Sequence, residues 1–131
     1  SERLLKIVEN STDLIYFIKT NSNLYKSLGF DDDRSSRINF YDKRLSGSYS
    51  IKKTLPVLSD LSYKNLDVKN GTEALVTYSL YDTMDEYDLQ KAKEALKIYC
   101  KQDTWAMVVI LDALRNMVKK ENCKTLVKKS V

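Results

Sequence analysis

The sequence predicts a mainly helical fold, for three reasons. Its 131 residues include only three glycines and one proline, too few for the many turns of a β-sandwich or barrel. Apolar residues recur at helical spacing over the longest patterned stretch, residues 89–118. Only Ile38 to Tyr41 alternate weakly between apolar and polar, as a short extended piece would. The length is that of one domain.

The first part of the chain predicts three short helices. Residues 2–9 form an amphipathic helix, and Ser11 or Thr12 caps a second helix through residues 14–18. Residues 24–28 add one further helical turn before a glycine.

A polar loop and a short helix are expected next. The loop covers residues 31–36, where three aspartates are followed by polar side chains. Ser48 or Ser50 then caps a helix through residues 51–55. Pro56 makes this helix short or kinked.

The second half leads into the longest helix. Residues 59–70 are expected to be extended or irregular, and Thr72 caps a helix over residues 73–80. An acidic cluster then lies at the start of the long helical stretch, where carboxylates favour the positive end of the helix dipole. Its members are Asp82, Asp85, Glu86 and Asp88.

Asp103 interrupts the apolar side of this long helix. At about 100° per residue, the apolar positions fall on one side, and Asp103 lies at its centre. These positions are Leu89, Ala92, Leu96, Tyr99, Met107, Ile110, Leu114 and Met117. A carboxylate there is costly to bury unless it is hydrogen-bonded, ion-paired or bound to a metal.

Two interpretations of Asp103 remain open. In the first, the helix breaks near Gln102, and Asp103 or Thr104 caps a second helix that starts at Trp105. In the second, Asp103 and Tyr99, one turn earlier, face a site of phosphate chemistry in which carboxylates hold divalent metal ions. Trp105 lies about 160° away from Asp103, so that side is either exposed or covered by something outside this chain.

Composition excludes several kinds of site. The chain has no histidine, which rules out Ser-His-Asp and Cys-His catalysis and histidine-containing metal sites. Cys100 and Cys123 form no CxxC pair and indicate a reduced, cytoplasmic protein. No apolar run approaches the roughly 20 residues that span a bilayer, and no membrane partner is expected. The net charge is +4, and the lysine-rich residues 119–131 account for the excess, as a solvated end commonly does.

Four motifs resemble those of one bacterial family, in order and spacing. They are Gly47–Pro56 (GSYSIKKTLP), Leu61–Tyr63 (LSY), Asn70–Gly71 and Tyr99–Val108 (YCKQDTWAMV). The resemblance covers roughly residues 38–118, and the family is number 2779 of the bacterial domains of unknown function. Its members usually follow a PD-(D/E)xK nuclease of the CRISPR-associated type.

That family is similar in turn to ribonuclease H-like exonucleases of the DEDD group. In that group four carboxylates bind two divalent metal ions, Mg²⁺ or Mn²⁺, for 3′ to 5′ cleavage of a nucleic-acid strand. Tyr99 and Asp103 match the tyrosine version of the last motif. The resemblance implies that both are catalytic and that Asp103 is a metal ligand, with Lys52, Lys53 and Arg44 against the nucleic-acid backbone.

The upstream carboxylates are absent from this sequence, which has no D-x-E on an apolar strand. We therefore expect residues 1–118 to be mainly α, the C-terminal helical half of an α/β ribonuclease H-like exonuclease fold whose main sheet is missing. Residues 119–131 form the lysine-rich tail. Such a fragment is expected to be inactive alone, to bind no metal tightly, and to pair with its missing N-terminal half or another chain.

Two alternatives to an exonuclease part remain. A helical interaction module without catalysis is one, since helices that have lost their sheet leave apolar faces uncovered. A degenerate uncharacterised protein is the other. For Lys52, Lys53 and Arg44, the corresponding alternative is ordinary solvated surface.

Overall fold

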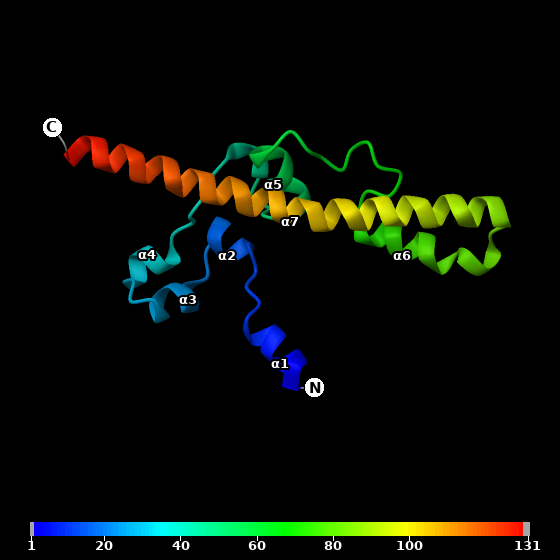
Figure 1. The fold of residues 1–131 in the computed structure, drawn as a ribbon, viewed down its shortest axis with the longest axis horizontal. Helices are drawn as coiled ribbons and strands as arrows, with labels where there is room; N and C mark the ends of the chain where they lie inside the picture. The colour runs from blue at the N-terminus through cyan, green and yellow to red at the C-terminus, as the bar shows by residue number, and fades with distance from the viewer. Residues whose placement is uncertain (1, 130–131) are drawn as a thin grey trace. The chain divides into compact units, whose positions relative to one another are not determined.

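The computed structural model describes the backbone of residues 2–129 and the side chains of residues 2–120. This described part is mainly helical and contains no strand, which confirms the predicted helical class (Figure 1). The chain divides into two compact units, residues 1–50 and residues 51–131.

Short helices make up the first unit. They are α1 (Glu2–Glu9), α2 (Ile15–Ile18), α3 (Ser22–Ser27), α4 (Asp32–Ser36) and the 3-10 helix η1 (Lys43–Leu45). The helices predicted over residues 2–9, 14–18 and 24–28 are therefore present. Ile18 and Leu45 are the buried apolar side chains of this unit.

The predicted cap of α2 is wrong. Asp13 Oδ1 accepts a hydrogen bond from the backbone N–H of Ile15 at 2.9 Å. The Ser11 hydroxyl instead donates to the carbonyl of Ile7 at 2.7 Å, at the end of α1. Ser11 thus serves the preceding helix, because its position puts its hydroxyl one turn beyond a free carbonyl.

The polar loop expected over residues 31–36 is also wrong, because α4 forms there. The Asp31 side chain caps it by accepting from the N–H of Arg34 at 2.7 Å. Asp32 and Asp33 then lie in the first turn, where carboxylates stabilise a helix. The aspartate run that suggested a loop is a helix start.

No strand forms at Ile38 to Tyr41 either. The N–H groups of Asn39 and Phe40 donate to the carbonyls of Lys19 and Ile18, at 2.7 and 2.8 Å. This segment therefore satisfies the free carbonyls at the end of α2 and has no strand partner.

A long helix, α7 (Glu86–Lys129), organises the second unit. Both α5 (Ile51–Leu58) and α6 (Gly71–Ser79) pack against it, and the 3-10 helix η2 (Tyr81–Thr83) leads into it (Figure 1). Pro56 lies inside α5, which is short, as predicted. Among the side chains described in this unit, the buried ones are Thr54, Leu55, Tyr63, Val68, Ala92, Tyr99, Ala106 and Ile110.

Asn70, and not Thr72, caps α6. Its Oδ1 accepts from the N–H of Glu73 at 2.9 Å, and its Nδ2 donates to Glu73 Oε1. Glu73 Oε2 also accepts from the N–H of Lys69 at 2.8 Å. These reciprocal bonds resemble a capping box, except that Glu73 accepts from the backbone N–H of Lys69 and not from that of Asn70. They start the helix two residues earlier than predicted.

The helix predicted over residues 89–118 lies within α7 and is continuous through Asp103. The break near Gln102, with Asp103 or Thr104 as a cap, is therefore wrong. The Thr104 hydroxyl donates to the carbonyl of Cys100, one turn back in the same helix. At the start of α7, Asp85 Oδ1 accepts from the N–H of Asp88 at 2.8 Å, so part of the acidic cluster does cap the helix.

The buried side of α7 is turned slightly from the predicted one. Ala106 is fully buried, whereas Met107 and Met117 are exposed. Small side chains at Ala92 and Ala106 allow close approach of the elements packed against α7. The predicted tail begins at residue 119, and α7 continues through it to Lys129; its side chains from residue 121 lie outside the described residues.

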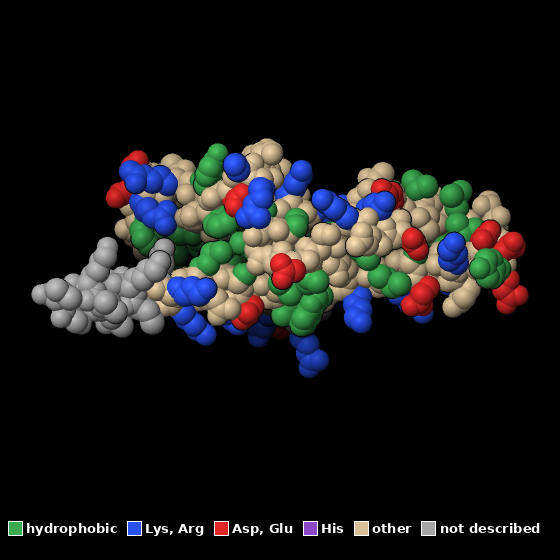
Figure 2. Space-filling view, turned by 90° about the horizontal axis from the view of Figure 1, so that it is seen from above, with side chains coloured by type: hydrophobic (Ala, Val, Ile, Leu, Met, Phe, Trp, Pro, Cys, Tyr) green, Lys and Arg blue, Asp and Glu red, His purple; other side chains and the backbone are tan. Residues whose placement is uncertain are grey.

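Many large apolar side chains remain exposed. Neither α1 nor α6 buries a residue fully. Figure 2 shows apolar side chains at the surface among charged ones, with acidic groups gathered at the end where η2 meets α7. Among the described residues, no helix is both long and apolar enough to cross a membrane.

Candidate functional site

Asp103, Tyr99 and Tyr63 form a cluster in the second unit. Asp103 is half-buried on α7, and Tyr99 lies one turn earlier with 8% of its surface exposed. Tyr63 comes from the irregular connection between α5 and α6 and is 5% exposed. Its hydroxyl donates to Asp103 Oδ1 at 2.6 Å. The two tyrosine rings lie 6.2 Å apart, tilted by 57°.

Local bonds lead the chain from α5 toward this cluster. The Ser59 hydroxyl donates to the carbonyl of Leu55 at 2.9 Å and accepts from the N–H of Leu61 at 3.2 Å. The N–H of Leu66 then donates to the carbonyl of Tyr63 at 3.2 Å. Buried Val68 anchors the far side of the connection. Tyr63 is thus held on both sides by residues of its own segment.

Both phenols of the cluster resist ionisation. Burial is the main cause that raises the pKa of Tyr63, and the hydrogen bond and negative charge of Asp103 raise it further. The pKa of Tyr99 is raised by the same causes in the same order. Both groups therefore keep their protons at neutral pH, and the Tyr63 hydroxyl acts as a donor to the carboxylate.

The cluster meets the main requirement for a buried carboxylate, a strong hydrogen bond. A phenol that donates to an ionised carboxylate forms a charge-assisted bond, about twice as strong as a neutral one. Chemically, the carboxylate can accept protons or supply an oxygen to a hard cation. Within the described residues, no three Asp, Glu, Cys or His side chains gather as a metal site. The cluster of Asp103, Tyr99 and Tyr63 itself contains one carboxylate.

Sequence reasoning brought Asp103 and Tyr99 together but missed Tyr63. The available signal was the position of Tyr63 in the LSY motif, one of the four matched segments. An aspartate on the packed side of a helix also favours a nearby donor, and Tyr63 is that donor.

The predicted basic residues belong to different units. Lys52 is half-buried and Lys53 exposed, both on α5 of the second unit. Arg44 lies in the first unit, where its guanidinium donates to both carboxylate oxygens of Asp42, at 2.9 and 2.7 Å. These bonds lower the pKa of Asp42 to about 2. Arg44 is thus already engaged by a bidentate ion pair.

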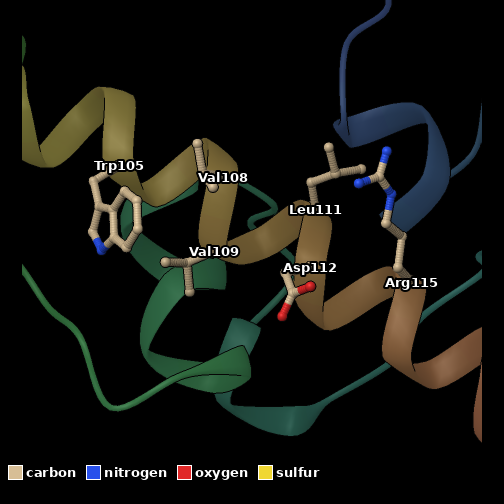
Figure 3. Close-up of a pocket in the computed structure, with 6 residues that line it drawn as sticks. All are labelled: Trp105, Val108, Val109, Leu111, Asp112 and Arg115. Atoms are coloured by element: carbon tan, nitrogen blue, oxygen red, sulfur yellow. The ribbon is translucent and has the colours of Figure 1, made fainter.

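Trp105 lies on the side of α7 opposite Asp103 and is 53% exposed within this chain, which fits both predicted options. Two shallow hollows flank it, of about 300 and 360 Å³. Figure 3 shows the residues that line the first, all from α7: Trp105, Val108, Val109, Leu111, Asp112 and Arg115. The second is lined by Lys101, Thr104, Trp105 and Val108. This apolar side of α7 is called the Trp105 face below.

Comparison with known proteins places this chain beside a longer bacterial protein. No family model matches the sequence, and no solved structure matches it. It is similar to a protein of Ureaplasma parvum named "Uncharacterized protein UU173", with 24% identity over 143 aligned positions and 97% of this chain covered. The match spans 21% of that protein, so the chain corresponds to about a fifth of its curated relative.

Proposed function

We propose that this chain is the C-terminal part of a metal-dependent 3′ to 5′ exonuclease-like domain that acts on nucleic acid. In this proposal Asp103 is the carboxylate of the last motif, and Tyr99 lies beside the reacting phosphate. Lys52, Lys53 and Arg44 contact the backbone of the strand.

The position of Asp103 carries the proposal. It lies on the packed side of an uninterrupted helix, with Tyr99 one turn before it. If Asp103 were a helix cap, its place on the apolar side of the helix would need no functional explanation. However, α7 continues through Asp103, so Asp103 is not a cap. What remains is a half-buried carboxylate that accepts a hydrogen bond from a phenol, and carboxylate oxygens are ligands that Mg²⁺ and Mn²⁺ prefer.

The metal ions, Mg²⁺ or Mn²⁺, do not fit the described residues alone. A pair of such ions needs several converging oxygen ligands, and the cluster supplies a single carboxylate. The proposal therefore assigns the other carboxylates to sequence outside this chain. The curated relative, of which this chain covers about a fifth, has ample further sequence for them. The chain by itself is expected to be inactive and to bind no metal tightly.

The test is a nuclease assay on a longer protein that carries this segment. End-labelled single strands of DNA and RNA are incubated with Mg²⁺ or Mn²⁺, with and without a chelator. Asp103→Asn is expected to abolish shortening from the 3′ end. Asp112→Asn is the matched control, because Asp112 is an exposed aspartate of the same helix. Full activity of the Asp103→Asn protein would end the assignment.

A second candidate is a helical interaction module without catalysis, and the Trp105 face favours it. Trp105 and Val108 are each about half exposed beside two hollows. Apolar surface of this kind is typical of contact sites. Light scattering and an apolar-surface dye test it on this chain: self-association or dye binding that Trp105→Ala reduces supports it. A monomer that binds no dye argues against it.

A further inference from the structure

The geometry points to Tyr63 as a positioning residue for Asp103. We propose that the Tyr63 phenol fixes the orientation of the Asp103 carboxylate, so that one conformation of the aspartate is available for chemistry. The catalytic consequence rests on the proposed function, whereas the orientation itself is a property of this chain.

The hydrogen bond is the first argument. The Tyr63 hydroxyl lies 2.6 Å from Asp103 Oδ1, within the short range of O–H bonds to carboxylates. An aspartate side chain has two rotatable bonds, and an exposed one samples several rotamers. A donor that holds one carboxylate oxygen restricts both rotations at once.

The rigidity of the donor is the second argument. Tyr63 is almost completely buried, and its ring lies against that of Tyr99 on α7. Ser59 and Val68 anchor the segment before and after it. The phenol therefore cannot follow the carboxylate if Asp103 rotates, and the bond favours a single geometry.

The separation in sequence is the third argument. Tyr63 and Asp103 are 40 residues apart and come from different elements. A bond within α7 would move with the helix, but this bond ties Asp103 to the packing of the connection between α5 and α6. The orientation of the carboxylate is thus set from outside its own helix, as outer hydrogen bonds set the orientation of functional ligands elsewhere.

Nuclear magnetic resonance on the 131-residue chain tests the orientation directly. Three-bond couplings between the α and β protons of Asp103 report its χ1 rotamers. We expect one dominant rotamer in the original chain and averaged couplings in Tyr63→Phe. Tyr25→Phe is the matched control, because the Tyr25 hydroxyl is also hydrogen-bonded, to Tyr16 and Asn39, but in the first unit. Unchanged Asp103 couplings in Tyr63→Phe would overturn the inference.

A measurement on the unchanged chain covers the case in which Tyr63→Phe fails to fold. The hydroxyl proton of Tyr63 is expected to exchange slowly with water, because it is buried and bonded. The hydroxyl proton of Tyr41, which is 80% exposed, gives the fast reference. Equal exchange of the two protons would contradict a fixed bond.

Kinetics on the longer protein separate this inference from the proposed function. Tyr63→Phe is expected to lower kcat by about 10- to 100-fold, as loss of an outer hydrogen bond does, with little change in KM. Tyr25→Phe should leave both constants unchanged. If Asp103→Asn is fully active, the proposed function fails, while the result of the nuclear magnetic resonance experiment on the Asp103 rotamer stands. If Asp103→Asn is inactive and Tyr63→Phe equals the original protein, the positioning role fails.

Discussion

Tyr63 and Tyr99 hold their protons in the folded chain more tightly than they do when the chain unfolds. In the unfolded chain a tyrosine has a pKa of about 10. Between that pH and the raised folded-state pKa, only the folded chain keeps the proton, so rising pH favours unfolding. The stabilisation is complete below pH 10 and is lost as the pH rises through the folded-state pKa.

We therefore predict that the free energy of unfolding falls above about pH 10, by up to about 1.4 kcal/mol per pH unit for each such tyrosine. Urea denaturation between pH 8 and 11 measures it. Tyr63→Phe should reduce the slope, because it removes one of the two tyrosines whose pKa is raised. A flat profile for the original chain would contradict the raised pKa values.

Asp103 and Tyr63 show which kind of site residue the sequence identifies and which kind it does not. Asp103 could be identified because it is polar at the centre of a periodic apolar side. Helical periodicity gave no sign of Tyr63, since Tyr63 lies in an irregular segment with no period to fix where its ring points; its place in the LSY motif was the available signal. Its role depends on a contact 40 residues away, and local pattern carries no information on such contacts.

At the scale of elements, the existence of most helices was predictable, whereas the short helix α4 and the helix starts were not. Hydrophobic period located the helices over residues 2–9 and 89–118, and it reflects which face is packed. The helix over residues 73–80 was predicted from a cap residue alone. Caps depend on which of several nearby polar side chains reaches a free N–H. At α6 both Asn70 and Thr72 are suitable residue types, and the reciprocal bonds with Glu73 decide for Asn70.

The cap of α6 gives a direct prediction. Asn70→Ala should destabilise the chain by about 1 kcal/mol, since it removes the acceptor for the Glu73 N–H and one donor to its carboxylate. Thr72→Ala should cost much less, because Thr72 is an exposed residue inside the first turn. Urea denaturation of both variants measures the difference, and a larger loss for Thr72→Ala would show that the cap is misassigned.

Two adjacent residues of α7 provide a test of its packing. Ala106 is 0% exposed, whereas Trp105, about 100° around the helix from it, is half exposed. Ala106→Leu should destabilise by about 1 to 3 kcal/mol, because added methyl groups overpack the side that faces the core. Trp105→Ala should stay within about 0.5 kcal/mol, as surface changes usually do. Thermal unfolding followed by circular dichroism compares them, and the reverse order would mean that α7 is rotated.

At the scale of the whole molecule, length predicted one domain, and the structure divides into units at residues 50 and 51. No proline- or glycine-rich linker marks that position, which falls inside the GSYSIKKTLP segment. Boundaries without a linker are set by where contacts concentrate, and composition does not report contacts. Helical content was predictable from scarce turn residues, but the division was not.

The proposed binding of nucleic acid also belongs to the whole molecule, because its affinity and the dependence of that affinity on salt sum over all the phosphate contacts. Each phosphate contact by a cation adds about 0.7 to the slope of log affinity against log salt for single strands. The double variant Lys52→Gln, Lys53→Gln should therefore lower this slope by about 1 to 1.5. Arg44→Gln should lower it less, since Asp42 already binds that guanidinium. Fluorescence anisotropy at several salt concentrations measures these slopes. An unchanged slope in the double variant would identify these lysines as ordinary solvated surface.

The bond between Tyr63 and Asp103 also has a consequence for the order of folding. Helix α7 is built from contacts between near neighbours, which form early, whereas this bond must close a loop of 40 residues. We expect it to be absent from the rate-limiting step. Tyr63→Phe should then accelerate unfolding and leave the refolding rate nearly unchanged in stopped-flow experiments. The orientation of Asp103 would thus be acquired last, only after the helix that carries it is complete.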